Sequence, residues 1–137
     1  MSTEDYDDED DNYPVPTGEL ALQNYAMPAD TNPRGDIFAG WLVSQMDLAG
    51  AIVAQRIARG RIATVAMNGM VFLTPVHVGA VVSCYAQVLE IGKSSVRVRI
   101  EVWKNHEETF EPVKVTEGDF IFVSIDERGR TRPIAKR

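Results

Sequence analysis

A proline-free and mostly apolar stretch from residue 37 to residue 59 is the feature that most constrains how this chain can fold. A loop rich in Pro, Asp, Asn and Gly precedes it and Gly60 follows it, so we expect one helix with Asp36 as its N-cap and Gly60 at its C-cap. At about 1.5 Å per residue, this helix spans roughly 30 Å, the width of a small domain. Apolar side chains cover nearly every direction of its first half, which predicts burial on most sides. The stretch therefore predicts a central helix wrapped by the rest of the protein.

Asp47 is the one acidic residue inside this stretch. A carboxylate in an apolar helix costs several kcal/mol unless it is paired, hydrogen-bonded or protonated, and proteins accept that cost mostly at working sites. The alternative is a structural aspartate satisfied by Ser44 or by water at a rim. Both interpretations of Asp47 remain open at this point, and the polar residues around it make the helix a poor membrane span.

One strand pattern precedes the helix and four follow it, at residues 18–27, 61–74, 80–91, 94–104 and 112–126. Between residues 94 and 104, valine and isoleucine alternate with charged residues, a period of two. Within 61–74 we expect one long strand with a bulge at Asn68-Gly69, although the same dipeptide is also a hairpin signal. This order predicts an α+β fold, an antiparallel sheet curled around one helix.

The length of 137 residues predicts one domain, and 45% hydrophobic with 25% charged residues is ordinary for a soluble globular protein. A single cysteine, Cys84, excludes an intrachain disulfide and favours a reducing cytosol, so we expect a cytoplasmic protein. The two histidines, His77 and His106, lie far apart in sequence, and no Cys/His cluster for zinc is present. We expect no metal and no cofactor.

The net charge of −6 is concentrated at the N-terminus, because residues 1–12 hold seven acids and no base. The remainder has 13 acids against 14 bases, about +1. We expect residues 1–15 to be a disordered, dispensable acidic tail and residues 16–134 to form the single domain. The basic residues from Arg128 onward, Arg132 included, are expected to be solvated.

The loop and helix motif is Asp30-Thr31-Asn32, Gly35-Asp36, Phe38, Gly40-Trp41 and Gln45-Met46-Asp47. It resembles the acyl-CoA thioester hydrolases of the hotdog fold, in their YciA-like branch. Further matches are Thr64-Val65, Phe72, Pro75, Gly79 and Gly92-Lys93-Ser94-Ser95, so the resemblance runs from about Leu20 to Ile134. The loop and helix carry most of its specificity.

This resemblance implies a hotdog domain that pairs into dimers and uses Asn32 and Asp47 as the catalytic pair, without a metal. Asp47 is the natural general base for a hydrolytic water. The free N–H groups around Ala39 and Gly40 at the helix start can donate to the developing oxyanion. Asn32 can orient the water or hold the carbonyl.

The resemblance also implies where the substrate binds. Gly92, Lys93, Ser94 and Ser95 form a hairpin that family members use against the phosphates of coenzyme A. Arg61 is a weaker candidate for the same task, and Thr64 is a further substrate-binding candidate. Acyl-CoA is the expected ligand, with neither nucleic acid nor membrane as a partner.

Two departures from the family pattern bear on acyl-chain specificity. Ala39 stands where the family usually has glycine, and its methyl group narrows the expected acyl slot. Met67-Asn68-Gly69 stands where the family usually has an acidic residue.

Three alternatives compete with the hydrolase interpretation. Gly92-Lys93-Ser94 fails as a phosphate-binding P-loop, because Gln87 replaces the required glycine and a strand follows. Cys84 as a nucleophile has no nearby histidine, and a buried strand cysteine is the simpler expectation. A non-catalytic acyl-CoA-binding module would keep the Lys93 hairpin but has no need for Asp47 in an apolar helix.

The spacing of Asn32 and Asp47 predicts active sites shared between chains. Asp36 and Asp47 lie roughly 16 Å apart along a helix axis, so one chain cannot easily bring Asn32 and Asp47 to one thioester carbon unless the loop folds back. A dimer with antiparallel helices can do so. We expect such a homodimer, assembling further into a hexamer, with a tetramer as the alternative that the sequence leaves open.

Overall fold

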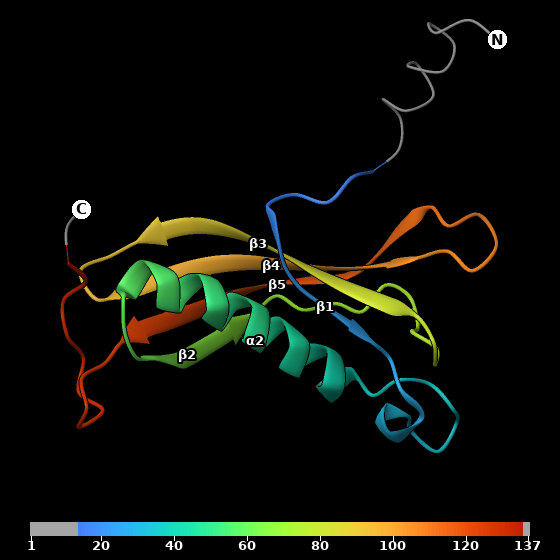
Figure 1. The fold of residues 1–137 in the computed structure, drawn as a ribbon, viewed down its shortest axis with the longest axis horizontal. Coiled ribbons are helices and arrows are strands. Elements are labelled where there is room, and N and C mark those ends of the chain that lie inside the picture. The colour runs from blue at the N-terminus through green and yellow to red at the C-terminus, as the bar shows by residue number, and fades with distance from the viewer. Residues whose placement is uncertain (1–13, 136–137) are drawn as a thin grey trace, which may run out of the picture.

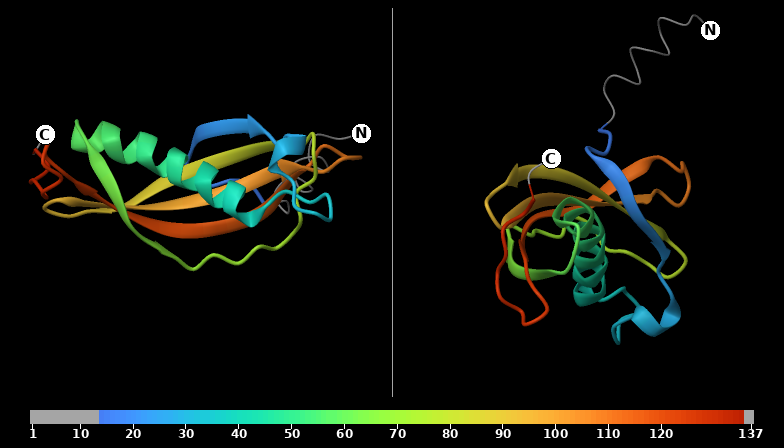
Figure 2. Two further views of the ribbon diagram at one scale, coloured as in Figure 1. Left: turned by 90° about the horizontal axis from the view of Figure 1, so that it is seen from below. Right: turned by 60° about the vertical axis from the view of Figure 1, so that its left-hand side comes forward.

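The computed structural model describes residues 14–135, which form one helix and a five-stranded antiparallel sheet (Figure 1). The elements are β1 (Glu19–Tyr25), the 3₁₀ turn η1 (Pro28–Asp30), α2 (Ala39–Ala58), β2 (Ile62–Asn68), β3 (Val81–Ile91), β4 (Ser95–Asn105) and β5 (Pro112–Ser124). The strand order is β1-β3-β4-β5-β2. The sheet curves around α2, which lies on its concave face (Figure 2). The predicted α+β layout is confirmed. Residues 1–13 of the expected acidic tail lie outside the described residues.

The β3–β4 hairpin and β5 follow the predicted strands closely. Side chains of β4 alternate as expected: Val96, Val98 and Ile100 are fully buried against α2, and Arg97 faces outward. On the outer face Arg97 and Arg99 donate to Asp119 of β5, at 3.1 and 3.0 Å. Partial burial alone would raise the pKa of Asp119, but these hydrogen bonds and charges hold it below its ordinary value. The ion pairs thus join β4 to β5 on the face that has no helix.

The prediction of one long strand over residues 61–74 is wrong, because β2 ends at Asn68. Gly69 has a φ of +74°, a left-handed conformation that takes the backbone out of the strand. The bulge lies earlier, between Thr64 and Ala66. Beyond Gly69 the chain continues beside β5 without forming a strand, held where the Leu73 N–H donates to the Val115 carbonyl at 2.8 Å.

Both predicted helix caps are also wrong. The N-cap is Phe38, because Asp36 is engaged elsewhere: its backbone forms a bridge with His77, and its Oδ1 lies 3.2 Å from His77 Nδ1. At the other end Arg59, not Gly60, takes the left-handed cap conformation, with a φ of 56°. The Arg59 N–H donates to the Gln55 carbonyl at 2.8 Å. The helix is therefore shorter at its start than the apolar pattern indicates.

Within one chain, α2 is buried along one stripe instead of on most sides. The buried residues recur three or four positions apart: Leu42, Gln45, Met46, Ala49, Gly50, Val53, Ala54 and Ala58. The opposite side of the helix is open to solvent and still carries large apolar side chains, with Leu48 53% and Ile52 46% exposed beside polar residues. One face of the helix thus meets the sheet, and the other has no cover from its own chain.

Gly50 permits the close approach of α2 to the sheet. A Cβ built on Gly50 would lie 2.7 Å from the ring of Phe122, which is fully buried, and 3.3 Å from Ile100. We expect Gly50→Ala to lower the free energy of unfolding by about 1–3 kcal/mol, because overpacking in a fixed core outweighs the roughly 1 kcal/mol gain in helix propensity. Denaturant unfolding of both proteins measures the difference. Gly40→Ala is the matched control, since a Cβ there meets nothing within 4 Å, and an equal loss in both variants would contradict the packing argument.

Candidate active site

Asp47 lies at the edge of the buried stripe of α2, and a hydrogen bond fixes its carboxylate. Thr64 Oγ1 of β2 donates to Asp47 Oδ1 at 2.6 Å. Thr64 occupies the position in β2 where the bulge begins, and both residues are half-buried. Ser44, one partner considered in the structural interpretation of Asp47, does not bond to it, because the Ser44 hydroxyl donates to the Trp41 carbonyl at 2.6 Å. Thr64, expected at the substrate, thus lies against the candidate base, where it orients Oδ1, while Oδ2 has no hydrogen-bond partner among residues 14–135.

Asn32 sits in a tight loop whose hydrogen bonds define the orientation of its amide. Its Oδ1 accepts from the backbone N–H groups of Arg34 and Asp36, at 2.9 and 3.1 Å. Its own N–H donates to the Asp36 carbonyl. Because the oxygen is engaged inside the loop, the side chain offers its Nδ2 hydrogens to a ligand. Of the two roles considered for Asn32, a donor role toward a carbonyl fits this geometry best.

The start of α2 supplies further donors. The N–H groups of Trp41 and Leu42 both donate to the Phe38 carbonyl. The N–H groups of Ala39 and Gly40 have no acceptor among the residues that the structure describes, and both residues are exposed. These two groups lie at the positive end of the helix dipole. They form a suitable place for an oxygen that gains negative charge.

The structure does not bring Asn32 and Asp47 together within one chain. Asp47 lies eight residues after Ala39, about 12 Å along the axis of α2. The Asn32 loop lies beyond the start of the helix and does not fold back along it (Figure 1). A thioester held at the Asn32 loop is therefore distant from Asp47 of the same chain.

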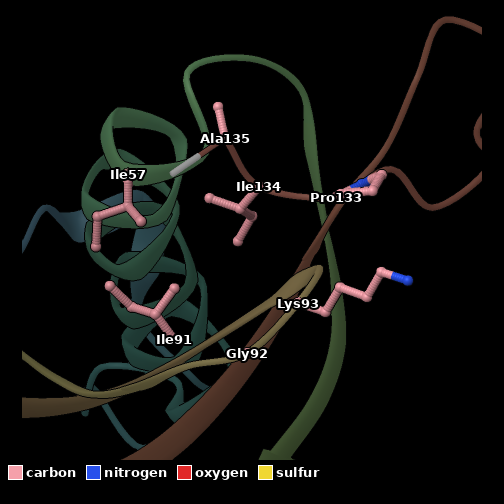
Figure 3. Close-up of a pocket in the computed structure, with 7 residues that line it drawn as sticks. All are labelled: Ile57, Ile91, Gly92, Lys93, Pro133, Ile134 and Ala135. Atoms are coloured by element: carbon pink, nitrogen blue, oxygen red, sulfur yellow. The ribbon is translucent and has the colours of Figure 1, made fainter. Parts of the chain in front are cut away.

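The Gly92–Ser95 hairpin borders a pocket of about 710 Å³ at the other end of α2. Its lining residues are Ile57, Ile91, Gly92, Lys93, Pro133, Ile134 and Ala135. In Figure 3 the Lys93 ammonium points away from Ile57 and Ile91. The pocket is thus mainly apolar, with a positive charge at its edge. Among the residues predicted to bind coenzyme A, the carrier of the acyl group, Ser94 and Ser95 are part-buried and Lys93 is exposed.

Arg61 lies between α2 and β2, and its guanidinium has partners inside the protein. It donates to the carbonyls of Glu127 and Asp126, at 3.0 and 3.4 Å. These bonds hold the turn after β5 to the start of β2, a structural task that the sequence pattern did not indicate.

Sequence reasoning missed the role of Arg132. This residue was expected to be solvated, but it is part-buried and donates to carbonyls of two other segments. The only local feature that distinguishes it from the neighbouring Arg128 and Arg130 is the Thr-Arg-Pro sequence around it, after the turn.

Cys84 is excluded as a nucleophile. It is fully buried in β3, and burial raises its pKa from 9.0 to about 12, so the thiolate is not formed at neutral pH. In the described part of the chain, no three His, Cys, Asp or Glu side chains group in a way that could hold a metal ion. None of the helices between residues 14 and 135 is long and apolar enough to cross a membrane.

Comparisons with known proteins agree with the predicted family. A family model described as the thioesterase superfamily matches residues 34–111. The acyl-CoA thioester hydrolase YciA of Salmonella typhimurium is 52% identical over 124 residues, which cover 88% of this chain and 92% of that protein. The YciA protein of Escherichia coli K12 is 51% identical, with coverage of 88% and 93%.

Two solved structures extend the likeness to the fold. HI0827, a hexameric broad specificity acyl-coenzyme A thioesterase, superposes with a TM-score of 0.88 at 46% identity, over 92% of this chain and 87% of that one. The hexameric thioesterase y2039 from Yersinia pestis superposes with a TM-score of 0.85 at 49% identity, over 89% and 100% of the two chains. The predicted hotdog fold is confirmed, and the chain belongs to the thioesterase superfamily, within its YciA-type acyl-CoA thioester hydrolases.

Proposed function

We propose that this protein hydrolyses acyl-CoA thioesters to free coenzyme A and a carboxylic acid. The single observation that supports this most strongly is the Thr64–Asp47 hydrogen bond, which presents the only carboxylate of α2 in one orientation beside an apolar helix face. Relatives of about half-identical sequence are named as hydrolases of the same substrate class.

In the proposed reaction, Asp47 accepts a proton from a water molecule while the water oxygen attacks the thioester carbon. The carbonyl oxygen becomes an oxyanion, stabilised by the N–H groups of Gly40 and Ala39 and by the helix dipole. Asn32 Nδ2 donates to the same oxygen. Collapse of the intermediate breaks the carbon–sulfur bond, and protonated Asp47 returns its proton to the departing thiolate. Thr64 donates a hydrogen bond to Asp47 Oδ1, so Asp47 Oδ2 is the atom that accepts the proton from water.

The rival function is a non-catalytic module that binds acyl-CoA. Such a module needs the Lys93 hairpin and its pocket, but it has no use for an oriented carboxylate half-buried next to apolar side chains. Incubating the protein with a panel of acyl-CoA thioesters and following free thiol separates the two functions. Absence of turnover across chain lengths would favour the binding module.

The uncovered face of α2 supports a dimer. Leu48 and Ile52 on the helix are exposed, and so are Val65 and Met67 on β2, the neighbouring edge strand of the sheet. Large apolar side chains exposed on two neighbouring elements favour an interaction surface, and an edge strand is a template for another strand. We infer that a second copy packs here around a twofold axis, with antiparallel helices.

This arrangement places Asn32 of one protomer near Asp47 of its partner, so the two chains share each site. Because HI0827 and y2039 are hexameric, we extend the proposal to a hexamer, a trimer of such dimers. The cytoplasmic location stays a prediction from the single reduced cysteine.

Asp47→Asn should abolish most activity without unfolding the protein. The asparagine oxygen can still accept from Thr64 but cannot take a proton, so we expect kcat to fall at least about a hundredfold at unchanged or higher Tm. Steady-state kinetics and thermal unfolding test this. Glu90→Gln, which neutralises an exposed carboxylate of β3, is the control and should leave kcat unchanged. Turnover retained in Asp47→Asn would reject Asp47 as the base.

Complementation between inactive variants tests the shared site. Asn32→Asp keeps the oxygen that holds Arg34 and Asp36 but removes the Nδ2 donor, so it should inactivate the enzyme while preserving the loop. Mixed dimers of Asn32→Asp with Asp47→Asn then contain one site with both defects and one intact site. Activity per mixed dimer should return to about half of the wild-type value.

Mass spectrometry verifies that mixed dimers have formed. Dimers that are verified as mixed and remain inactive would show that each site is built within one chain.

Lys93→Ala tests whether the hairpin binds the carrier. An exposed charge contributes about 1 kcal/mol or less, so we expect KM for acyl-CoA to rise up to about fivefold with kcat unchanged. A truncated pantetheine thioester, which has no nucleotide, should be hydrolysed equally by both proteins. Equal losses on both substrates would exclude a role in binding the nucleotide part.

A further inference from the structure

Segment 131–135 crosses the end of the molecule and connects three elements. The Arg132 N–H donates to the Ser124 carbonyl at the end of β5, at 2.9 Å. The Ile134 N–H donates to the Lys93 carbonyl in the β3–β4 hairpin, at 2.8 Å. Figure 1 shows this segment, in red, beside the end of α2 and the hairpin. We call segment 131–135 the strap.

The side chain of Arg132 attaches the strap to the helix. Its Nη2 donates to the Ala58 carbonyl at 3.0 Å, one of the terminal carbonyls that a helix leaves without an intrahelical partner. Its Nε donates to the Ile125 carbonyl at 3.2 Å. A Cβ on Gly60 would lie 2.3 Å from Nη2, so the guanidinium fills the space that this glycine leaves. The planar fork of arginine donates to the two carbonyls from two separate nitrogens in a fixed geometry, which the single nitrogen of an ammonium group does not provide.

The strap forms one wall of the pocket next to Lys93. Pro133, Ile134 and Ala135 supply three of the seven lining residues, opposite Ile57 of α2 and Ile91 of β3 (Figure 3). Without the strap, this side of the pocket would open to solvent. We call this pocket the carrier pocket and the two hydrogen bonds of the Arg132 side chain the anchor. The geometry of the carrier pocket therefore depends on the anchor.

We propose that Arg132 is a positioning residue for binding of the coenzyme A carrier, acting through the strap. This inference rests on the proposed function, in which the Lys93 hairpin binds the carrier. Ala58 lies eleven residues after Asp47, roughly 16 Å along α2, so loosening the strap weakens substrate binding and leaves the chemical step intact. Arg132 is not assigned a contact with substrate in this role, because its Nε and Nη2 both donate to backbone carbonyls.

The rival explanation is a direct contact between the charge of Arg132 and a phosphate of the substrate, and the experiment must distinguish it from positioning through the strap. Arg132 and Lys93 also line a smaller pocket of about 250 Å³ with Ser94, Thr131 and Pro133, where two cations could meet a phosphate. Variants that keep the positive charge but lose the two-carbonyl anchor distinguish the explanations. Arg132→Lys does this directly, and Gly60→Ala does it by occupying the space of Nη2.

The experiment compares Arg132→Ala, Arg132→Lys, Gly60→Ala and Lys93→Ala on an acyl-CoA and on the truncated pantetheine thioester. The anchor variants are Arg132→Ala, Arg132→Lys and Gly60→Ala. We expect all three to raise KM for acyl-CoA about fivefold, at unchanged kcat and without effect on the truncated substrate. Combining Gly60→Ala with Arg132→Ala should add nothing further, because both remove the same anchor. Arg130→Ala removes an equal charge from the same turn and is the matched control, with KM unchanged.

Each other outcome contradicts a defined part of the inference. If only Arg132→Ala raises KM, the guanidinium acts by its charge and the positioning role is overturned. If Lys93→Ala raises KM and no anchor variant does, the strap has no part in binding while the proposed function stands. If the anchor variants lose kcat on both substrates, Arg132 supports the fold as a whole and not the carrier pocket. Loss of activity by unfolding is recognised from Tm, and Arg132→Lys, which keeps charge and length, then carries the test.

Discussion

The close packing of α2 against the concave face of the sheet is the constraint on which the rest of the structure depends. Small residues, Ala49, Gly50 and Ala54, line the side of the helix that meets Phe122 and its neighbours, so the helix approaches the strands closely. That contact fixes the rotation of α2 about its own axis. With the small residues turned inward, Asp47 falls at the margin, within reach of Thr64 on the edge strand β2. The orientation of the candidate base is thus a consequence of core packing.

The helix also separates three tasks along its length. Free N–H groups and the Asn32 loop lie at its start, the oriented carboxylate lies in its middle, and its last carbonyl receives Arg132. A substrate with a long carrier suits this layout, because coenzyme A extends far from the thioester. A twofold arrangement of antiparallel helices would bring the start of one helix to the middle of the other. The proposed dimer therefore follows from the same spacing that keeps Asn32 and Asp47 apart within one chain.

Much of this could be predicted from the sequence, because the informative signals are local. The alternation in β4 and the proline-free run of α2 predicted the elements, and Asp47 became the candidate base because it is the single carboxylate of that run. The apolar pattern could not say which helix face meets which partner, since large apolar residues such as Leu48 and Ile52 also stand on the face that remains open. Burial on most sides was therefore a wrong prediction for a single chain.

Several of the contacts that sequence reasoning missed join residues far apart in the chain. Asp36 looked like an N-cap, but His77 engages it from forty-one positions away. Thr64 and Arg132 have partners on other elements, and neither belongs to a periodic pattern. Propensity and periodicity describe how a residue relates to its neighbours in sequence, so tertiary hydrogen bonds of this kind lie outside their reach.

The position of the strap in the chain has a consequence for synthesis. A ribosome makes β1, α2 and every strand before it reaches residue 131, and these elements already contain Asp47, Thr64 and the full sheet. The pocket wall is added afterwards, by a few residues whose anchor is a helix end completed more than seventy residues earlier. A translation product that stops just short of the strap would thus contain every strand, α2 and the Asp47–Thr64 pair, but it would lack one wall of the carrier pocket.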